Sequence, residues 1–141
     1  MTLYKTDFYA WTLQQAEHLR AEAMEQLDIQ NLIEEIEGMS SSERRQLSNR
    51  LHVLLMHLLK LLCQKHENPK RWLATIREQR RRIGYLLKDS PSLRNLLDER
   101  IADVYPDARD EAAEETGLLL DTFPAICPWT TAQIMDNHFY P

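Results

Sequence analysis

Two polar side chains interrupt the most apolar stretch of the chain and are the first candidates for chemistry. His57 and Lys60 stand three positions apart, so on a helix they are neighbours on one face. A histidine titrates near neutral pH and burial lowers the pKa of a lysine, so the pair could transfer protons or hold an anion. Buried charge also needs a partner, which Glu34 and Glu37 of the preceding segment could supply. We favour this structural interpretation of the candidate polar site formed by His57, Lys60, Glu34 and Glu37, because ion-pair networks also perturb pKa values.

Arginines precede two of the histidines at a spacing used by small helical ribonucleases, which have an Arg-x4–6-His motif. The pairs are Arg45 with His52 and Arg50 with His57, each with six residues between. In a chain with twelve arginines and five histidines, about one such match arises by chance. A small hydrolase that uses His57 or His52 with a nearby arginine is therefore the alternative function and not the preferred one.

No metal or cofactor signature accompanies these residues. Glu-x-x-His, His-Glu-x-x-His and Cys-x-x-Cys do not occur, and three glycines are too few for a glycine-rich phosphate loop. Neither a Cys-x-x-Cys motif nor a basic neighbour marks Cys127 as a reactive thiol, and Cys63 lies within the apolar run, where a free thiol behaves as a small buried hydrophobe. We expect neither a bound metal nor a cofactor.

Charge is unevenly distributed along the chain. Residues 60–88 carry nine basic and two acidic side chains, whereas residues 89–121 carry three basic and ten acidic ones. A basic face with Arg77, Arg80 and Arg81 could bind nucleic acid or an acidic partner. The acidic segment of the same molecule could neutralise that face instead, and we favour this intramolecular pairing over nucleic-acid binding.

The elements that position these residues are predicted to be helical. Apolar residues recur at helical spacing, strand-like alternation is weak, and capping residues and prolines place the helix ends. Helices are expected to start at Asp7, Asp28, a Ser40–Glu43 capping box, Asn68-Pro69, Ser90-Pro91 and Thr130 or Thr131. They are expected to end at Gly38, about Gln64, and Gly117. Pro106 should kink or divide the last long helix.

One helix should be central. Ten of the thirteen residues in 51–63 are apolar, so this segment must be covered on most sides. The tail holds Phe123, Ile126 and Trp129, which we expect to fold back on the bundle. The predicted fold class is all-α: one domain over residues 1–141, built as a bundle of about five main helices round the apolar helix 51–63, with a proline-rich and aromatic tail packed on it.

The net charge and the apolar run bear on the surroundings of the protein. A net charge of −5 favours solubility, and the run 51–63 is too short to span a bilayer. No apolar leader follows the first residues, so we expect a cytoplasmic protein without a membrane partner.

Several segments in order along the chain resemble the bacterial family called domain of unknown function 29. They are 3–11 (LYKTDFYAW), 31–37 (NLIEEIE), 54–60 (LLMHLLK), Trp72 with Thr75 and Ile76, 90–93 (SPSL), 115–118 (ETGL), and 123–129 (FPAICPW). The resemblance implies an all-helical fold and brings no established activity or functional residues. We therefore favour a non-catalytic helical module that binds a protein partner, with the charged faces giving specificity and the oligomeric state left open.

Overall fold

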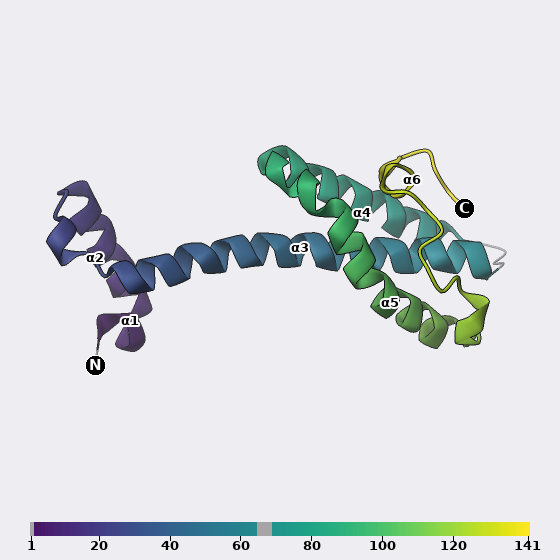
Figure 1. The fold of residues 1–141 in the computed structure, drawn as a ribbon, viewed down its shortest axis with the longest axis horizontal. Helices are drawn as coiled ribbons and strands as arrows, with labels where there is room; N and C mark the ends of the chain where they lie inside the picture. Colours follow the sequence, from purple (N-terminus) through teal and green to yellow (C-terminus); the bar gives the residue numbers. More distant parts are fainter. Residues whose placement is uncertain (1, 65–68) are drawn as a thin grey trace. The chain divides into compact units, whose positions relative to one another are not determined.

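The computed structural model describes residues 2–64 and 69–141, and within these ranges every regular element is a helix or a 3-10 turn (Figure 1). The all-α class is confirmed. In chain order the elements are α1 (Leu3–Thr6), α2 (Phe8–Arg20), η1 (Met24–Gln26), α3 (Ile29–Cys63), α4 (Lys70–Asp89), η2 (Pro91–Leu96), α5 (Leu97–Thr116), η3 (Leu120–Thr122) and α6 (Thr131–Met135).

The contacts divide the chain into two compact units. The N-terminal unit ends at Ser42 and contains α1, α2, η1 and the first turns of α3. The C-terminal unit, Glu43–Pro141, contains the rest of α3 and all later elements. The organisation as one domain over residues 1–141 stays a prediction.

Helix α3 corrects the expected boundary at Gly38. The predicted end at Gly38 and the new start at the Ser40–Glu43 capping box are wrong, because one helix of 35 residues, Ile29–Cys63, runs through both. A glycine inside a helix costs only about 1 kcal/mol relative to alanine, so it does not end a helix whose hydrogen-bond ladder continues on both sides.

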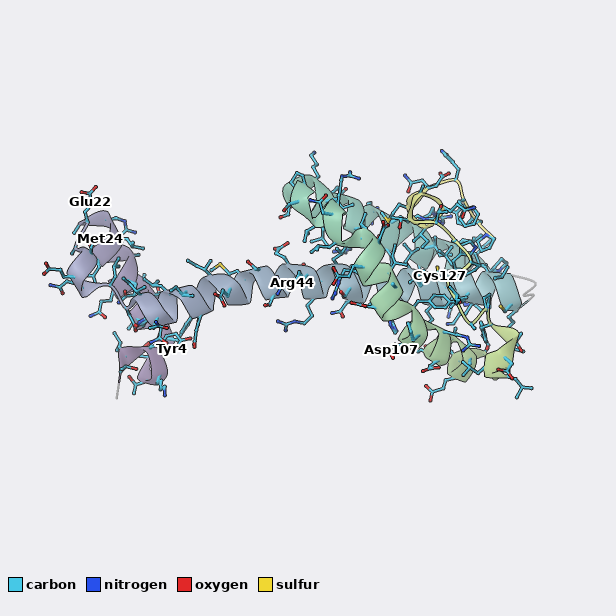
Figure 2. All side chains as sticks on the ribbon, viewed as in Figure 1. Tyr4, Glu22, Met24, Arg44, Asp107 and Cys127 are labelled. Atoms are coloured by element: carbon cyan, nitrogen blue, oxygen red, sulfur yellow. The ribbon has the colours of Figure 1, made fainter. Side chains whose placement is uncertain are left out.

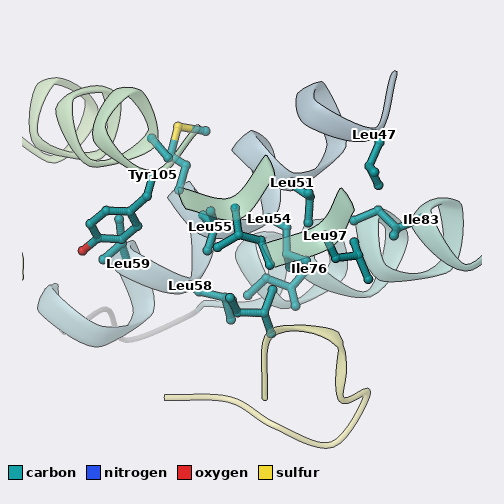
Figure 3. Packing of buried hydrophobic residues seen from close by; sticks show 14 of the residues in the cluster. Leu47, Leu51, Leu54, Leu55, Leu58, Leu59, Ile76, Ile83, Leu97 and Tyr105 are labelled. Atoms are coloured by element: carbon teal, nitrogen blue, oxygen red, sulfur yellow. The ribbon is translucent and has the colours of Figure 1, made fainter. Parts of the chain in front are cut away.

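The core of the C-terminal unit lies on the second half of α3. Five leucines in the segment 51–63 of α3 are completely buried, and α4, α5 and the tail supply the residues that cover them (Figures 1 and 3). The prediction that the apolar helix 51–63 is central to the bundle is thereby confirmed. The leucines are Leu51, Leu54, Leu55, Leu58 and Leu59, and their cover includes Ile76, Ile83, Leu97, Ile101, Tyr105, Phe123 and Ile134.

The capping signals predicted at Asp7, Asp28, Thr130 and Gly117 are confirmed. The side chain of Asp7 accepts from the N–H of Ala10 (3.0 Å), and that of Asp28 accepts from the N–H of Asn31 (3.4 Å). Thr130 forms a complete capping box at the start of α6. Gly117 has a left-handed φ of 74° and ends α5, as expected for a residue without a Cβ.

The positions of two prolines and one residue of the tail could be determined only from the structure. Pro106 lies inside α5 and does not divide it. Pro69 caps α4, whereas Asn68, the other half of the expected start signal, lies outside the described residues. Phe123 is buried and Trp129 packs against the core, as expected, but the prediction for Ile126 is wrong, because its side chain is 82% exposed.

The path of the tail explains the exposure of Ile126. The Tyr105 hydroxyl donates to the carbonyl of Pro124 (2.6 Å), and Arg109 donates to that of Phe123 (3.0 Å). These bonds hold the chain beside α5, where Phe123 turns inward and Ile126 faces solvent.

Candidate functional site

Lys60 makes its main contact with α5. Its side chain is 8% exposed, its Nζ atom donates to the carboxylate of Glu115, and it lies 5.7 Å from the centre of the Trp72 ring. A cation over an aromatic face is attracted to the ring quadrupole. The charge of this buried lysine is thus satisfied by a carboxylate and a ring of the same unit.

The two histidines of α3 also have internal partners. His52 pairs with Glu111 of α5, one turn before Glu115. His57 Nδ1 lies 2.8 Å from the carbonyl of Val53, and since a carbonyl oxygen only accepts, Nδ1 carries the proton. Burial lowers the pKa of His57 and Lys60 lowers it further, while the Val53 carbonyl, Glu115 and Glu111 raise it less in sum. His57 is therefore neutral at pH 7.

The partners expected for the polar site, Glu34 and Glu37, are replaced by the glutamates of α5. Glu34 and Glu37 belong to the N-terminal unit, whereas His57, Lys60 and the two glutamates of α5 belong to the C-terminal unit. Glu111 and Glu115 stand four apart and so share a face of α5. That spacing was a usable signal, but it did not say which helix this face would meet.

The arginine–histidine pairs do not form a compact catalytic group. Arg45 and His52, like Arg50 and His57, are seven positions apart on α3, which is about two turns or ~10 Å along the axis. Arg50 donates to Gln79 of α4 at 3.4 Å.

The basic face expected on α4 is divided between two roles. Arg80 is 3% exposed and donates to the carbonyl of Ile134 (2.8 Å), at the end of α6. Arg81 and Arg82 both donate to Glu78 of the same helix. These arginines therefore do not make the predicted pairs with the acidic residues of α5, and Arg77 lines a surface pocket beside them.

An aromatic cluster and one aspartate hold the N-terminal unit together. The ring of Tyr4 meets that of Trp11 edge to face at 4.7 Å, and the Phe8 ring stacks on Trp11 at 5.6 Å. The Trp11 indole donates to Asp28 Oδ2 (3.1 Å), which also accepts from the Asn31 side chain (2.8 Å). The hydrogen bond from Asn31, then that from Trp11, lowers the pKa of Asp28 against the opposing effect of burial.

Tyr4 joins α1 to α3 (Figure 2). Its hydroxyl donates to Glu35 at 2.5 Å, and this bond to a carboxylate raises the pKa of Tyr4 to about 12. The bond and the ring contacts place α1, α2 and the start of α3 against one another.

An apolar groove of about 370 Å³ lies between α2 and α3. Its lining follows helical spacing on both helices, with Phe8, Trp11, Thr12, Gln15, Ala16 and Leu19 from α2 and Leu32, Glu35, Ile36 and Met39 from α3. Several of these side chains face solvent: Phe8 is 48% exposed, Ile36 61% and Met39 66%. Reasoning from sequence missed the groove because the apolar stripe of α2 does not show which other helix it lies beside.

The unit around the groove is strongly acidic. Up to Ser42 the chain carries eight acidic and two basic side chains, a net charge of −6, against −5 for the whole chain. Glu34 and Glu37 are exposed on α3, and Glu35 lies in the groove wall. The glutamates proposed as partners of His57 therefore belong to the surface of the groove unit.

The segments 3–11 and 31–37, which carry the family resemblance, meet through the bond between Tyr4 and Glu35. The family described as "Domain of unknown function DUF29" matches residues 3–140, nearly the whole chain. The chain belongs to this family. Comparison with curated proteins and with solved structures finds no match.

Two further findings concern metal-binding clusters and membrane-spanning helices in this DUF29 chain. Within residues 2–64 and 69–141, no three His, Cys, Asp or Glu side chains converge in the way a metal ion requires. No helix in those same ranges is long and apolar enough to cross a membrane. Both thiols, Cys63 and Cys127, are free, and burial raises the pKa of each.

Proposed function

We propose that this DUF29 protein is a non-catalytic interaction module whose N-terminal unit binds a cationic amphipathic helix of a protein partner. The observation that carries the proposal is the apolar groove between α2 and α3, set in a unit with a net charge of −6. The proposal commits to a helical partner with an apolar face and lysines or arginines beside it.

Exposed apolar surface supports docking at this unit. Among the described residues, ten of the fifteen large apolar side chains that are exposed belong to it, although it holds fewer than a third of the residues. Four of the ten, Phe8, Leu19, Ile36 and Met39, line the groove, and exposed apolar patches are typical of interaction sites. The ten are Leu3, Phe8, Tyr9, Leu13, Leu19, Met24, Ile29, Ile33, Ile36 and Met39.

The shape of the groove supports a helical ligand. Two helices with apolar stripes at i, i+3, i+4 and i+7 leave a channel that accepts the apolar face of a third. Met39 is at one end of the channel, and a methionine side chain adapts to the shape of what it contacts.

The negative charge of the unit favours a partner with positive charge. A basic segment that docks in the groove meets Glu35 in its wall and approaches a unit whose net charge is −6. Complementary charge speeds association and disfavours acidic competitors. A second copy of this unit would bring the same carboxylates together, so a cationic partner fits the surface better than self-association does.

The internal partners of the polar residues also support a binding role. Lys60 is paired with Glu115, His52 with Glu111, and the Nδ1 atom of His57 with a carbonyl oxygen. A hydrolytic role for His57 would have to break such contacts. We also expect a cytoplasmic location, where the thiols of Cys63 and Cys127 would stay reduced.

Titration calorimetry with a designed peptide tests the function. The probe is an 18-residue amphipathic helix of leucine and lysine, and its controls are a scrambled peptide and one with glutamate in place of lysine. We expect micromolar affinity for the full chain, at least tenfold weaker binding of both control peptides, and a falling affinity as salt rises.

A matched pair of variants locates the binding. Ile36→Ser removes an exposed apolar side chain from the groove, whereas Ile126→Ser removes a similarly exposed one from the tail of the C-terminal unit. Burying an isoleucine contributes about 1.5–3 kcal/mol, so Ile36→Ser should weaken peptide binding roughly tenfold or more. Equal affinities for the two variants, or no binding by the native chain, would refute the proposal.

A further inference from the structure

A second pocket lies on the C-terminal unit, outside the apolar groove. It measures about 560 Å³ and is formed by one stripe of α4 and by the segment after α6. Its lining residues are Ala74, Arg77, Glu78, Arg80, Arg81, Gly84 and Asn137. Three of these seven residues are arginines, so the pocket gathers positive charge.

Arg80 is the buried member of this set. It is 3% exposed, its Nε donates to the carbonyl of Ile134 (2.8 Å), and one of its terminal nitrogens lies 3.5 Å from the carbonyl of Gln133. Its guanidinium carbon is 5.3 Å from the centre of the Tyr140 ring. Its other terminal nitrogen, Nη1, is buried without a hydrogen-bond partner among the described residues.

These contacts leave the charge of Arg80 incompletely compensated. Its hydrogen bonds to the backbone go to uncharged carbonyl oxygens, and its guanidinium lies over the ring of Tyr140. Burial lowers the pKa of Arg80, and Tyr140 and Asp136 offset only part of that effect. Buried charges are normally paired or bound to a ligand, so an unpartnered guanidinium nitrogen in a pocket wall points to an anion.

The neighbouring charges leave the pocket positive. Glu78 is the acidic member of the lining, and its carboxylate already accepts from Arg81 and Arg82. Arg77 is exposed on the same stripe, one turn before Arg81. The lining therefore carries a net charge of +2 before Arg82 is counted.

We propose that this pocket binds a small organic phosphate, with Arg77 and Arg81 holding the phosphoryl oxygens and Arg80 supplying a desolvated positive charge at the base. The planar guanidinium matches the geometry of phosphate oxygens. The volume lies in the range of small-molecule sites. A Cβ added at Gly84 would meet nothing within 4 Å, so the organic part of the ligand has room beside it.

The proposal is independent of the function proposed for the N-terminal unit, since no residue of the pocket belongs to that unit. Its test is titration calorimetry of the full chain with adenosine 5′-monophosphate, with adenosine as the probe that lacks the phosphate. We expect the monophosphate to bind at least tenfold more tightly than adenosine and the difference to shrink at high salt.

Two matched pairs of variants distinguish a loss of ligand binding from a loss of folding. Gly84→Glu and Gly84→Gln add side chains of equal size to an exposed helix position, and both should favour helix. We expect Gly84→Glu to bind adenosine monophosphate at least tenfold more weakly than Gly84→Gln. Arg77→Gln should weaken binding by a similar factor, whereas Arg94→Gln, which alters an exposed arginine of the same unit outside the pocket, should not.

Equal binding of the monophosphate and adenosine would overturn the proposal, as would equal binding by the two Gly84 variants or by Arg77→Gln and Arg94→Gln. A short single-stranded RNA forms the last arm. If it binds a hundredfold more tightly than the monophosphate, this face is a nucleic-acid surface and the small-ligand proposal is wrong.

Discussion

The ammonium group of Lys60 and the carboxylate of Glu115 form an ion pair between α3 and α5 whose two ends differ in environment. The lysine side chain is 8% exposed and the glutamate side chain is 44% exposed. Loss of the lysine would return the carboxylate to water, whereas loss of the carboxylate would strand a buried cation. The two ends of the pair thus differ in exposure to solvent. If Lys60 is a structural residue, the loss of each end should change the stability of the protein by a different amount.

Replacing Lys60 and replacing Glu115 should therefore change the free energy of unfolding by different amounts. Lys60→Met keeps the aliphatic bulk and should change the free energy of unfolding by less than about 1 kcal/mol, because an apolar residue replaces a buried charge. Glu115→Gln should destabilise the protein by roughly 1–3 kcal/mol, since the buried ammonium loses its charged partner. Urea denaturation measures both values, and a larger loss for Lys60→Met would contradict the structural role.

His57 predicts a specific pH dependence. Its pKa is lowered in the folded protein, mainly by burial, so the unfolded chain binds a proton at His57 more readily. Stability from this residue is present above about pH 6.5 and is lost as the pH falls from there toward the folded pKa. The flanking charges of Lys60, Glu111 and Glu115 remain unchanged in His57→Gln.

The measurement is the free energy of unfolding at pH 7.5 and pH 5.5 for the native chain and His57→Gln. The native chain should lose more stability between the two values than the variant does. An equal or smaller loss in the native chain would show that His57 is not held neutral in the fold.

Two glycines should respond oppositely to alanine. Gly38 lies inside α3 and an added Cβ meets nothing within 4 Å, so Gly38→Ala should stabilise the protein by up to about 1 kcal/mol. Gly117 has a left-handed φ of 74°, so Gly117→Ala should destabilise it by roughly 1 kcal/mol. Thermal unfolding followed by circular dichroism compares the two, and destabilisation by Gly38→Ala would indicate a helix break at residue 38.

Local signals predicted some helix ends and did not predict which helices pack against one another. Asp7, Thr130 and Gly117 act on backbone groups within a few residues, so the sequence predicts them directly. The end predicted at Gly38 was wrong because a local preference of about 1 kcal/mol does not outweigh a continuing helix. Glu115 is 55 residues from Lys60, and nothing in the sequence specified that α5 would bring them together.

The groove could not be predicted for the same reason, because local signals do not specify how helices pack against one another. The apolar spacing of α2 indicates which face is apolar and not what covers it, so the exposure of Phe8 and Leu19 could not be predicted from it. In the structure both are about half exposed. The net charge of −6 over the first 42 residues was a signal in the sequence that this segment differs from the rest.

Nuclear magnetic resonance with methyl-labelled full-length protein tests the docking of a cationic helix most directly. On titration with the leucine–lysine peptide, the methyl signals of Leu19, Leu32, Ile36 and Met39 should shift, whereas those of Ile76, Ile83 and Leu97 in the core of the C-terminal unit should stay in place. Shifts confined to the C-terminal unit, or none at all at millimolar peptide, would contradict the account.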